Sequence, residues 1–435
     1  MSGMHLGRKK IANYFVLRSV FTTFVAMIQN EEIEGKRIAL LLSGGVDSAV
    51  ALHQLCELGQ KPDCFYIKIG ATPDAFEEGD LPGADCTMEE DMEMATSVAH
   101  KYGCRLEVVD CHREYWDQVT TYTMEKVRAG LTPNPDVMCN RLIKFGAFDE
   151  KRGHEYDLIA TGHYAQTATA SPQPPPKGGG VLPRLGFPLL LEGGGGRLLC
   201  TSPDPVKDQT DFLAQLYWWQ LQKALFPIGH MMKDEVRQIA EREHLVNAKR
   251  KDSQGICFLG KINYNDYIRH YLGELPGDVV ELETGRKIGR HKGLWFHTIG
   301  QRHGLGFGGG PWFAVKKDMA TNILYVSHGY DPQTAYKQDF KVKGMNWLAP
   351  VTPSQLGEGI TFKIRHTPEF HKGSLTPRSA EGRLQGKNPS PKGEGNHDSF
   401  TIVSEEPIHG VAPGQFCVIY DAEHHYCFGS GEITI

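Results

Sequence analysis

A cysteine in a proline-containing loop is the first candidate for chemistry in this sequence. Cys139 lies near the end of loop 131–140, where two prolines restrict the backbone. The residues that follow, 141–149, have a helical pattern, and Arg141 and Lys144 are close to the thiol in sequence. A helix N-terminus and nearby cations lower the pKa of a thiol, so the pattern predicts a reactive thiolate at Cys139. Most cysteines are small buried hydrophobes, and that alternative stays open here.

A second candidate thiol follows a run of three cations. Residues 249–251 are Lys-Arg-Lys, a polar turn begins at Asp252, and Cys257 then lies between apolar neighbours. Such a run is usually a solvated face, but next to a turn and a thiol it also suits phosphate contacts or a stabilised thiolate. Cys139 and Cys257 are far apart in the sequence, so only the tertiary structure can bring them together.

A third candidate is an anion site at the start of the first βα unit. Residues 38–42 are an apolar run typical of a buried parallel strand, and residues 49–58 have helical spacing that ends at Gly59. Between them lies Ser-Gly-Gly-Val-Asp-Ser at 43–48. Backbone N–H groups at such a turn, next to a helix N-terminus, favour phosphate binding. The loop lacks the lysine of the kinase and GTPase phosphate loop.

The elements that must position these residues alternate along the chain. Further strands are expected at 64–69, 106–109 and 156–161, and helices at 88–102 and 115–129. This alternation predicts an α/β fold with a doubly wound parallel sheet. Ligands bind beyond the carboxyl ends of such strands, where both 43–48 and 161–164 are expected to lie.

The pattern changes along the chain and predicts several parts. These are an N-terminal extension (1–32), an α/β catalytic domain (33–223), a small mixed connector domain (224–336) and a C-terminal antiparallel β-barrel (337–435). Pro/Gly-rich segments at 170–197 and 374–398 are expected to be surface insertions. The basic extension is expected to be a ragged end, with a transit peptide as the alternative.

Composition limits the class of protein. With 435 residues, two or three domains are expected, and no apolar run is long enough for a membrane span. A net charge of −5 argues against a generally basic surface but leaves room for a local basic groove. The ten cysteines form no Cys-x-x-Cys pair, which excludes zinc-finger and secreted disulfide-rich classes and favours a reducing cytoplasm.

Several separated strings occur in one fixed order. They are Ser43–Ser48, Thr132–Asn140, Ala160–Ala165, Lys207–Phe212, Asp252–Cys257, Thr298–Arg302, Lys363–His366 and Pro413–Gln415. Together they resemble the tRNA-specific 2-thiouridylases of bacteria and organelles, which belong to the PP-loop ATP pyrophosphatase superfamily. The resemblance covers nearly everything from about residue 36 to the end, apart from the two insertions. It implies a PP-loop type of α/β domain.

The resemblance also implies a two-step reaction on the wobble uridine of certain tRNAs. ATP, with Mg²⁺, adenylates O2 of the base, and sulfur carried as a persulfide on Cys257 then attacks C2. Cys139 would act on that persulfide, directly or by freeing hydrosulfide, and finish in a disulfide with Cys257. Asp136, three residues before Cys139, is placed for general acid/base work. An upstream donor would supply the sulfur, and the free protein is expected to be a monomer.

The other roles carry over position by position. The nucleotide would be held by Leu41, Leu42, Ser43, Gly44, Gly45, Val46, Asp47, Ser48, Ile67 and Gly162, and no metal site made by the protein alone is expected. Asn134, Pro135 and Asp136 would surround the target base. Contacts to tRNA are implied for His163, Lys207, Asp208, Gln209, Arg365, His366 and Gln415, where structural hydrogen bonding is the alternative for His163 and Gln415. Ile67 and the Arg365-His366 pair depart from the family's commoner Met and Arg-Tyr.

Two other classes of function stay open. A PP-loop amidating ligase would adenylate a carboxylate or carbonyl and use ammonia, and it would need neither paired thiols nor an RNA surface. A tRNA-binding protein with an idle nucleotide fold would bind RNA irrespective of Cys139 and Cys257. The subcellular alternative is an organelle, if residues 1–32 are a transit peptide.

Overall fold

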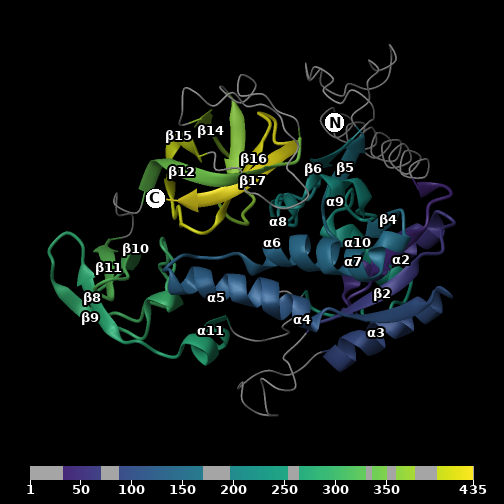
Figure 1. The fold of residues 1–435 in the computed structure, drawn as a ribbon, viewed down its shortest axis with the longest axis horizontal. Coiled ribbons are helices and arrows are strands. Elements are labelled where there is room, and N and C mark those ends of the chain that lie inside the picture. The colour runs from purple at the N-terminus through teal and green to yellow at the C-terminus, as the bar shows by residue number, and fades with distance from the viewer. Residues whose placement is uncertain are drawn as a thin grey trace, which may run out of the picture.

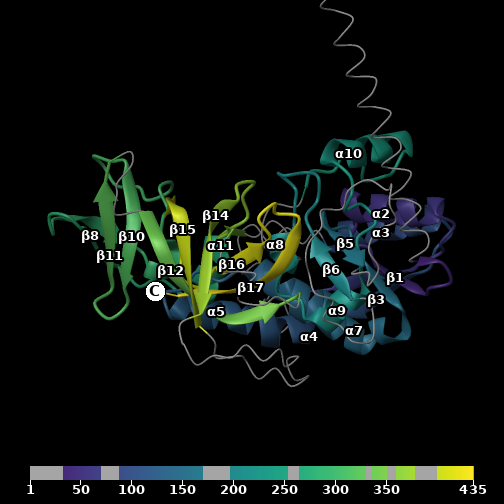
Figure 2. The same ribbon diagram turned by 90° about the horizontal axis from the view of Figure 1, so that it is seen from above.

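The computed structural model describes residues 33–69, 88–169, 196–252, 264–329, 336–349, 359–377 and 399–434. It has an α/β part, a small mixed sheet and a β-barrel, which Figure 2 shows in a row with the barrel in the middle. The N-terminal extension, nearly all of both predicted insertions and Cys257 lie outside the described residues.

The α/β part is built on a five-stranded sheet in the order β3-β2-β1-β4-β7, and all of its pairings are parallel. Its strands are β1 (Ile38–Leu41), β2 (Asp63–Lys68), β3 (Leu106–Asp110), β4 (Leu158–Ala160) and β7 (Ala224–Leu225). Side chains alternate between the two faces of a strand, so Leu40 and Leu41 enter different hydrophobic cores, one on each side of the sheet. The predicted doubly wound parallel sheet is confirmed.

Helices cover both faces of this sheet (Figure 1). One core contains residues from α2 (Val46–Glu57), α3 (Met88–Lys101) and α10 (Lys233–Arg242). The other contains residues from two longer helical runs. The first run consists of α4 (His112–Glu114), the π-helical η1 (Tyr115–Thr120) and α5 (Thr121–Arg128). The second consists of α6 (Pro135–Cys139), the π-helical η2 (Asn140–Ala147) and α7 (Phe148–Lys151). Short elements are η3 (Gly153–Glu155), α8 (Thr210–Leu213) and α9 (Trp218–Lys223).

The α/β part extends beyond the boundary expected at residue 223. Strand β7 (Ala224–Leu225) pairs with β4, and Val236 and Ala240 of helix α10 are buried in the core that also contains α2. A strand of two residues is too short to show a periodic pattern in the sequence. Only its pairing with β4 identifies it as part of the sheet. Residues 224–248 therefore belong to the α/β fold rather than to a connector.

A mixed sheet and helix α11 (Tyr264–Leu272) follow. The sheet has the order β10-β11-β8-β9, with β8 (Gly277–Glu281), β9 (Lys287–His291), β10 (Trp312–Asp318) and β11 (Ile323–His328), and a short helix η4 (Leu294–Phe296) precedes β10. Only the β11–β8 pairing is parallel among these strands. Tyr267 and Ile268 of α11 pack with Met124 and Val127 of α5, so this part rests on the α/β part.

The C-terminal sheet closes on itself and confirms the predicted antiparallel barrel. Six strands follow the order β12-β15-β14-β13-β16-β17, and a β12–β17 pairing closes the ring. They are β12 (Tyr336–Trp347), β13 (Ile360–Lys363), β14 (His371–Pro377), β15 (Ser399–His409), β16 (Phe416–Tyr420) and β17 (Tyr426–Thr434). Two strands of the α/β part, β5 (Gln166–Thr169) and β6 (Arg197–Cys200), extend this sheet through a β6–β17 pairing. The barrel and the α/β part are thus joined by backbone hydrogen bonds.

Candidate functional site

The loop between β1 and α2 has the geometry of a phosphate site. The backbone turns at Gly44, which has a φ of +77°. The Ser48 hydroxyl accepts a hydrogen bond from the Ser43 N–H at 3.2 Å and donates to the Gly45 carbonyl at 3.1 Å. Helix α2 has Gly45 as its N-cap, with no side-chain cap. Because the first N–H groups of a helix have no partner within it, this end can receive an anion.

Replacing Gly44 by alanine should abolish nucleotide binding without unfolding the protein. A Cβ at this position would lie 2.3 Å from the Asp91 carbonyl oxygen, and the positive φ is itself unfavourable for a side chain. The loop must therefore move away from helix α3, which displaces its N–H groups. Gly59→Ala is the matched control, since Gly59 has the same φ of +77° but lies at the far end of α2, where a Cβ would meet no heavy atom within 4 Å. Equal ATP affinity in both variants, measured by calorimetry, would contradict this reading of the loop.

A network of charges surrounds Asp47, the second residue of α2. The Tyr164 hydroxyl donates to Asp47 Oδ1 at 2.8 Å, and Lys233 Nζ lies 2.7 Å from the same oxygen. Lys233 also lies 2.8 Å from Asp252, which pairs in turn with Lys207 at 2.6 Å. These cations hold the pKa of Asp252 well below its usual range, although burial alone would raise it. Lys233 and Asp252 were not predicted as site residues.

The outer side of the loop is held by residues that follow α10. The Asn247 amide donates to the Gly44 and Gly45 carbonyls at 2.9 and 3.0 Å. Arg250 pairs with Asp91 of α3 and lies 3.4 Å from the Gly44 carbonyl. The loop therefore has its carbonyls fixed from one side, and the first N–H groups of α2, which have no partner within the helix, are the groups that can meet an anion.

The other predicted nucleotide residues lie at the same edge of the sheet. Gly162 follows strand β4 and packs so closely that a Cβ there would lie 2.7 Å from the Ser48 backbone nitrogen. Ile67 is buried near the end of β2, next to β1. Leu41, Leu42 and Val46 are buried supports of the loop, and Ser43 is exposed. The strands β1, β2 and β4 thus bring these residues together, as expected for a parallel sheet.

In the segment 131–140, called the thiol loop below, the helix begins earlier than the start at residue 141 that the sequence predicted. Helix α6 begins at Pro135, and Asn134 is its N-cap, with its side chain accepting from the Val137 N–H at 3.2 Å. Cys139 is therefore inside a continuous helix that runs on into η2, and its side chain is buried. Asp136 lies one helical turn before Cys139 on the same face. The Asn cap and the Pro at the first helical position were the signals for this start.

The barrel forms hydrogen bonds to the loop that precedes this helix. The Gln415 amide donates to the carbonyls of Thr132 and Pro133 at 2.9 and 3.1 Å. The Thr132 N–H in turn donates to the Pro413 carbonyl at 2.8 Å. A Cβ on Gly414 would lie 2.8 Å from the Thr132 backbone nitrogen. The segment 413–415 therefore fixes the backbone that leads to Asn134 and Cys139.

Two contacts join the thiol helix to the rest of the α/β part. Lys144 of η2 lies 3.5 Å from Nε2 of His163, which stands directly after Gly162. The Asn140 amide donates to the Phe212 carbonyl at 3.1 Å. The helix that carries Cys139 is therefore tied to the turn after β4, beside the phosphate loop. Cys257 lies outside the described residues, so the meeting of the two thiols stays a prediction.

Family models match most of the chain. One described as the tRNA methyl transferase HUP domain matches residues 36–261, one described as the tRNA methyl transferase PRC-barrel domain matches 265–328, and one described as the aminomethyltransferase beta-barrel domain matches 390–433. A tRNA-specific 2-thiouridylase MnmA 2 of Bacteroides fragilis is 54% identical over 91% of this chain and 99% of its own length.

The chain belongs to the tRNA-specific 2-thiouridylase family. Other relatives agree: an MnmA of Porphyromonas gingivalis and one of Parabacteroides distasonis are each 51% identical over 91% of this chain. They cover 99% and 98% of those two proteins. Among solved structures, an NMN synthetase of Francisella tularensis covers 30% of this chain at 12% identity with a TM-score of 0.19, too small a likeness to bear on the fold.

Three of the residues expected to contact tRNA have internal partners. Asp208 is buried and lies 3.1 Å from Lys363, an ion pair that joins the α/β part to the barrel. The Gln209 side chain accepts from the Tyr164 N–H at 2.9 Å. His163 is buried, and its Nδ1 lies 2.7 Å from the Thr161 hydroxyl. Asp208 and His163 are buried, which for His163 favours the alternative of structural hydrogen bonding, and contact of these three residues with tRNA stays a prediction.

The remaining expected tRNA residues keep accessible surface. Lys207 is 36% exposed beside Asp252. Arg365 is exposed and donates to the Gly410 carbonyl, and His366 is 39% exposed and lies 3.1 Å from Asp211. Gln415 is half-buried on the thiol loop. Contact of these four with tRNA stays a prediction.

Acid should destabilise this protein partly through His163. Burial lowers the pKa of His163 well below its ordinary value of 6.5. Between the two pKa values the unfolded chain binds more protons than the folded one, so stability is present above about pH 6.5 and falls as the pH drops below it. Urea midpoints at pH 7.5 and 5.5 should differ less in His163→Gln than in the wild type. An unchanged difference would show that His163 is protonated in the folded protein.

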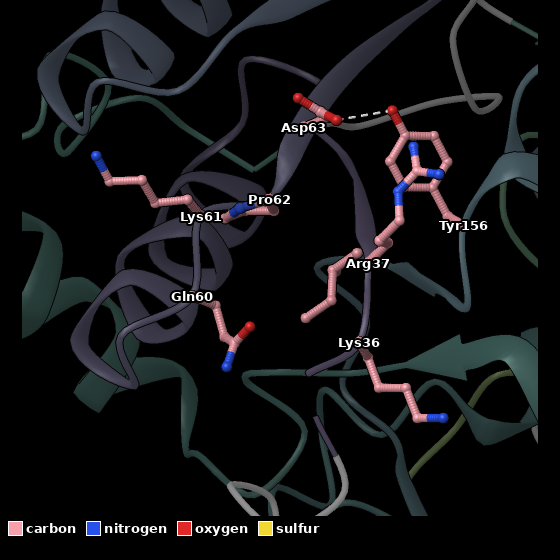
Figure 3. Close-up of a pocket in the computed structure, with 8 residues that line it drawn as sticks. Lys36, Arg37, Gln60, Lys61, Pro62, Asp63 and Tyr156 are labelled. Carbon is pink, nitrogen blue, oxygen red and sulfur yellow. Dashed lines mark hydrogen bonds between the residues drawn. The ribbon is translucent and has the colours of Figure 1, made fainter. Parts of the chain in front are cut away.

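The cavity in Figure 3 lies away from the candidate site. It has a volume of about 160 Å³ and is lined by Lys36, Arg37, Gln60, Lys61, Asp63 and Tyr156, among others. Strand β2 begins at Asp63 and β1 begins one residue after Arg37, so the cavity lies at the amino ends of the strands. The phosphate loop follows the carboxyl end of β1, at the opposite edge of the sheet.

Two features are absent from the part of the chain that the structure describes. In it, no helix is both long enough and apolar enough to cross a membrane. In the same residues, no group of three or more His, Cys, Asp or Glu side chains is arranged to hold a metal ion.

Proposed function

We propose that this protein forms 2-thiouridine at the wobble position of tRNA in an ATP-dependent reaction. One observation carries the proposal: the contact between Lys144 and His163 joins the helix of Cys139 to the turn after β4, which lies beside the phosphate loop. The relatives that match nearly their whole length are named tRNA-specific 2-thiouridylases, which supports tRNA as the substrate. A loop uridine splayed out of its stack can enter such a site.

The loop suits the phosphates of ATP, and its carboxylate suits Mg²⁺. The uncapped start of α2 and the close packing at Gly44 leave N–H groups for phosphate oxygens. Asp47 would offer Oδ2 to Mg²⁺ if Lys233 kept its bond to Oδ1 and left the 3.0 Å contact with Oδ2. Ile67 and Gly162 would line the adenine or ribose end. Bound ATP supplies the adenylyl group that turns the uracil O2 into a leaving group.

The thiols then perform the sulfur transfer. The outer sulfur of the Cys257 persulfide bonds to C2 of the base as the C2–O2 bond breaks, and O2 leaves with AMP. The Cys139 thiolate attacks the inner sulfur of Cys257, so a Cys139–Cys257 disulfide forms as the persulfide bond breaks. A dithiol reductant restores both thiols. Asp136, one helical turn from Cys139, exchanges the proton of the thiol or of the base.

The surroundings of the site suggest how the barrel and the partners contribute. Asn134 caps the thiol helix, and Pro135 begins it, so both would lie beside the target base. The proposed tRNA contacts are the exposed Arg365 and His366 and the half-buried Gln415 on the barrel, with Lys207 and Gln209 on the α/β part. We further propose an upstream persulfide donor protein, a monomer in the absence of tRNA, and action in the cytoplasm.

A reconstituted reaction tests this function. Purified protein, ATP, Mg²⁺, unmodified tRNA and a low-molecular-weight persulfide as the sulfur donor should give 2-thiouridine, detected by mass spectrometry of the nucleosides, and omission of ATP should abolish it. A product that contains nitrogen from ammonia instead of sulfur would identify an amidating ligase. Tight tRNA binding with no modified nucleoside and no AMP release would identify a binding protein with an idle nucleotide fold.

A further inference from the structure

Lys233 is a cation beside the phosphate loop that the sequence pattern does not reveal. It is the first residue of α10 and lies 186 positions after Asp47 in the chain. Its ammonium is 2.7 and 3.0 Å from the two carboxylate oxygens of Asp47 and 2.8 Å from Asp252. The side chain is only 12% exposed. The ammonium is therefore held between two carboxylates at the first turn of helix α2.

We propose that Lys233 is a phosphate-binding residue of the nucleotide site and contacts ATP directly. The inference rests on the proposed function, because it assumes that ATP binds at residues 43–48. Asp47 is the second residue of α2, so an ammonium bonded to it lies beside the helix N-terminus where a phosphate is favoured. A lysine binds phosphate as a compact point charge with three N–H donors.

The other described cations around the loop have different positions. Arg250 pairs with Asp91 and reaches the carbonyl of Gly44, on the outer side of the loop. Lys207 and Arg237 pair with Asp252, at 2.6 and 2.5 Å. Among these four cations, Lys233 is the one that bonds to Asp47. It is therefore the cation best placed to meet an anion at the start of α2.

The surrounding charges allow Lys233 to turn toward a phosphate without leaving a carboxylate alone. If its ammonium moves away from Asp252, that carboxylate keeps Lys207 and Arg237. Asp47 keeps the hydrogen bond from the Tyr164 hydroxyl and can keep one N–H of the lysine. Lys233 also offsets the repulsion that Asp47 would exert on the phosphates.

Calorimetric titration with Mg²⁺-ATP and with inorganic pyrophosphate tests the proposal. Loss of a charged phosphate contact should weaken both affinities in Lys233→Met by about ten- to a hundredfold, and Lys233→Arg should recover most of this loss. Pyrophosphate is included because it has no base or ribose. Lys223→Met is the matched control, since Lys223 is a part-buried lysine paired with Asp149 at 2.5 Å.

The results separate this proposal from the proposed function. If the wild type binds neither ligand, the nucleotide site and Lys233's role in it both fail. If the wild type binds ATP and Lys233→Met binds it as tightly as Lys223→Met does, Lys233 is only a structural ion-pair partner. Should Lys233→Met not fold, Lys233→Gln carries the test, because its amide can still donate to Asp47 but brings no charge to a phosphate.

Discussion

Replacing Cys139 by serine should abolish formation of 2-thiouridine while the protein stays folded. In the proposed reaction the Cys139 sulfur attacks the Cys257 persulfide, and a serine hydroxyl is a far weaker nucleophile toward sulfur. The rate of thiolation should fall on the order of 10³-fold or more. Mass spectrometry of tRNA nucleosides measures it, and calorimetry should show unchanged ATP affinity, since Cys139 lies on α6 and not on the phosphate loop.

Cys111→Ser is the matched control for this prediction. Cys111 and Cys139 are both fully buried in the same hydrophobic core, so a serine hydroxyl in either place carries a similar burial cost. Cys111→Ser should lose stability and keep its thiolation rate. Thiolation that persists in Cys139→Ser, or that is lost equally in both variants, would mean that the Cys139 sulfur has only a packing role.

The variant Lys363→Met should destabilise the protein by about 3–5 kcal/mol. Lys363 and Asp208 are 1% and 2% exposed and lie 3.1 Å apart, so removal of the ammonium leaves a carboxylate buried without its counter-ion. Burial already raises the pKa of Asp208, against the lowering effect of Lys363. Lys363 is in barrel strand β13 and Asp208 is in the α/β part, so the lost ion pair is one that joins these two parts. Urea denaturation should measure the effect as a lower free energy of unfolding.

A second substitution on the partner residue tests the origin of this loss. In the double variant that combines Lys363→Met with Asp208→Asn, no unpaired charge remains, so much of the lost stability should return. In the wild type the Ser202 N–H and the Thr210 hydroxyl donate to different oxygens of Asp208. The amide oxygen can still accept from the Ser202 N–H, and the amide nitrogen can donate to the Thr210 hydroxyl oxygen. A double variant no more stable than Lys363→Met alone would show that the charge is not the cause.

Local pattern was sufficient for much of the fold. The apolar run before Ser43, the glycines after it and the helical spacing up to Gly59 all depend on neighbours in sequence, and each element lies where it was expected. The alternating residues of the C-terminal region likewise predicted the barrel. Strand periodicity and glycine turns are local properties, so one sequence carries them directly.

Short or displaced elements show where local pattern was insufficient. The strand Ala224–Leu225 has two residues, and only its pairing with β4 makes it part of the sheet. The helix start at Pro135 had its signals in the sequence, but the two prolines of the loop also fitted a rigid turn. The helix is favoured by the capping hydrogen bond that the Asn134 side chain accepts and by the hydrogen bond from Gln415 to the Thr132 carbonyl.

The sequence by itself determined the family and the parallel sheet, and it predicted which loops hold the phosphates and the thiol. The tertiary structure decided which side chains lie beside those loops. It placed Lys233 on Asp47 across 186 positions, and it buried Asp208 and His163, for which the sequence predicted tRNA contact, with structural hydrogen bonding as the alternative for His163. The physical reason is that an ion pair or a buried contact depends on distance in space, which no spacing along one chain specifies.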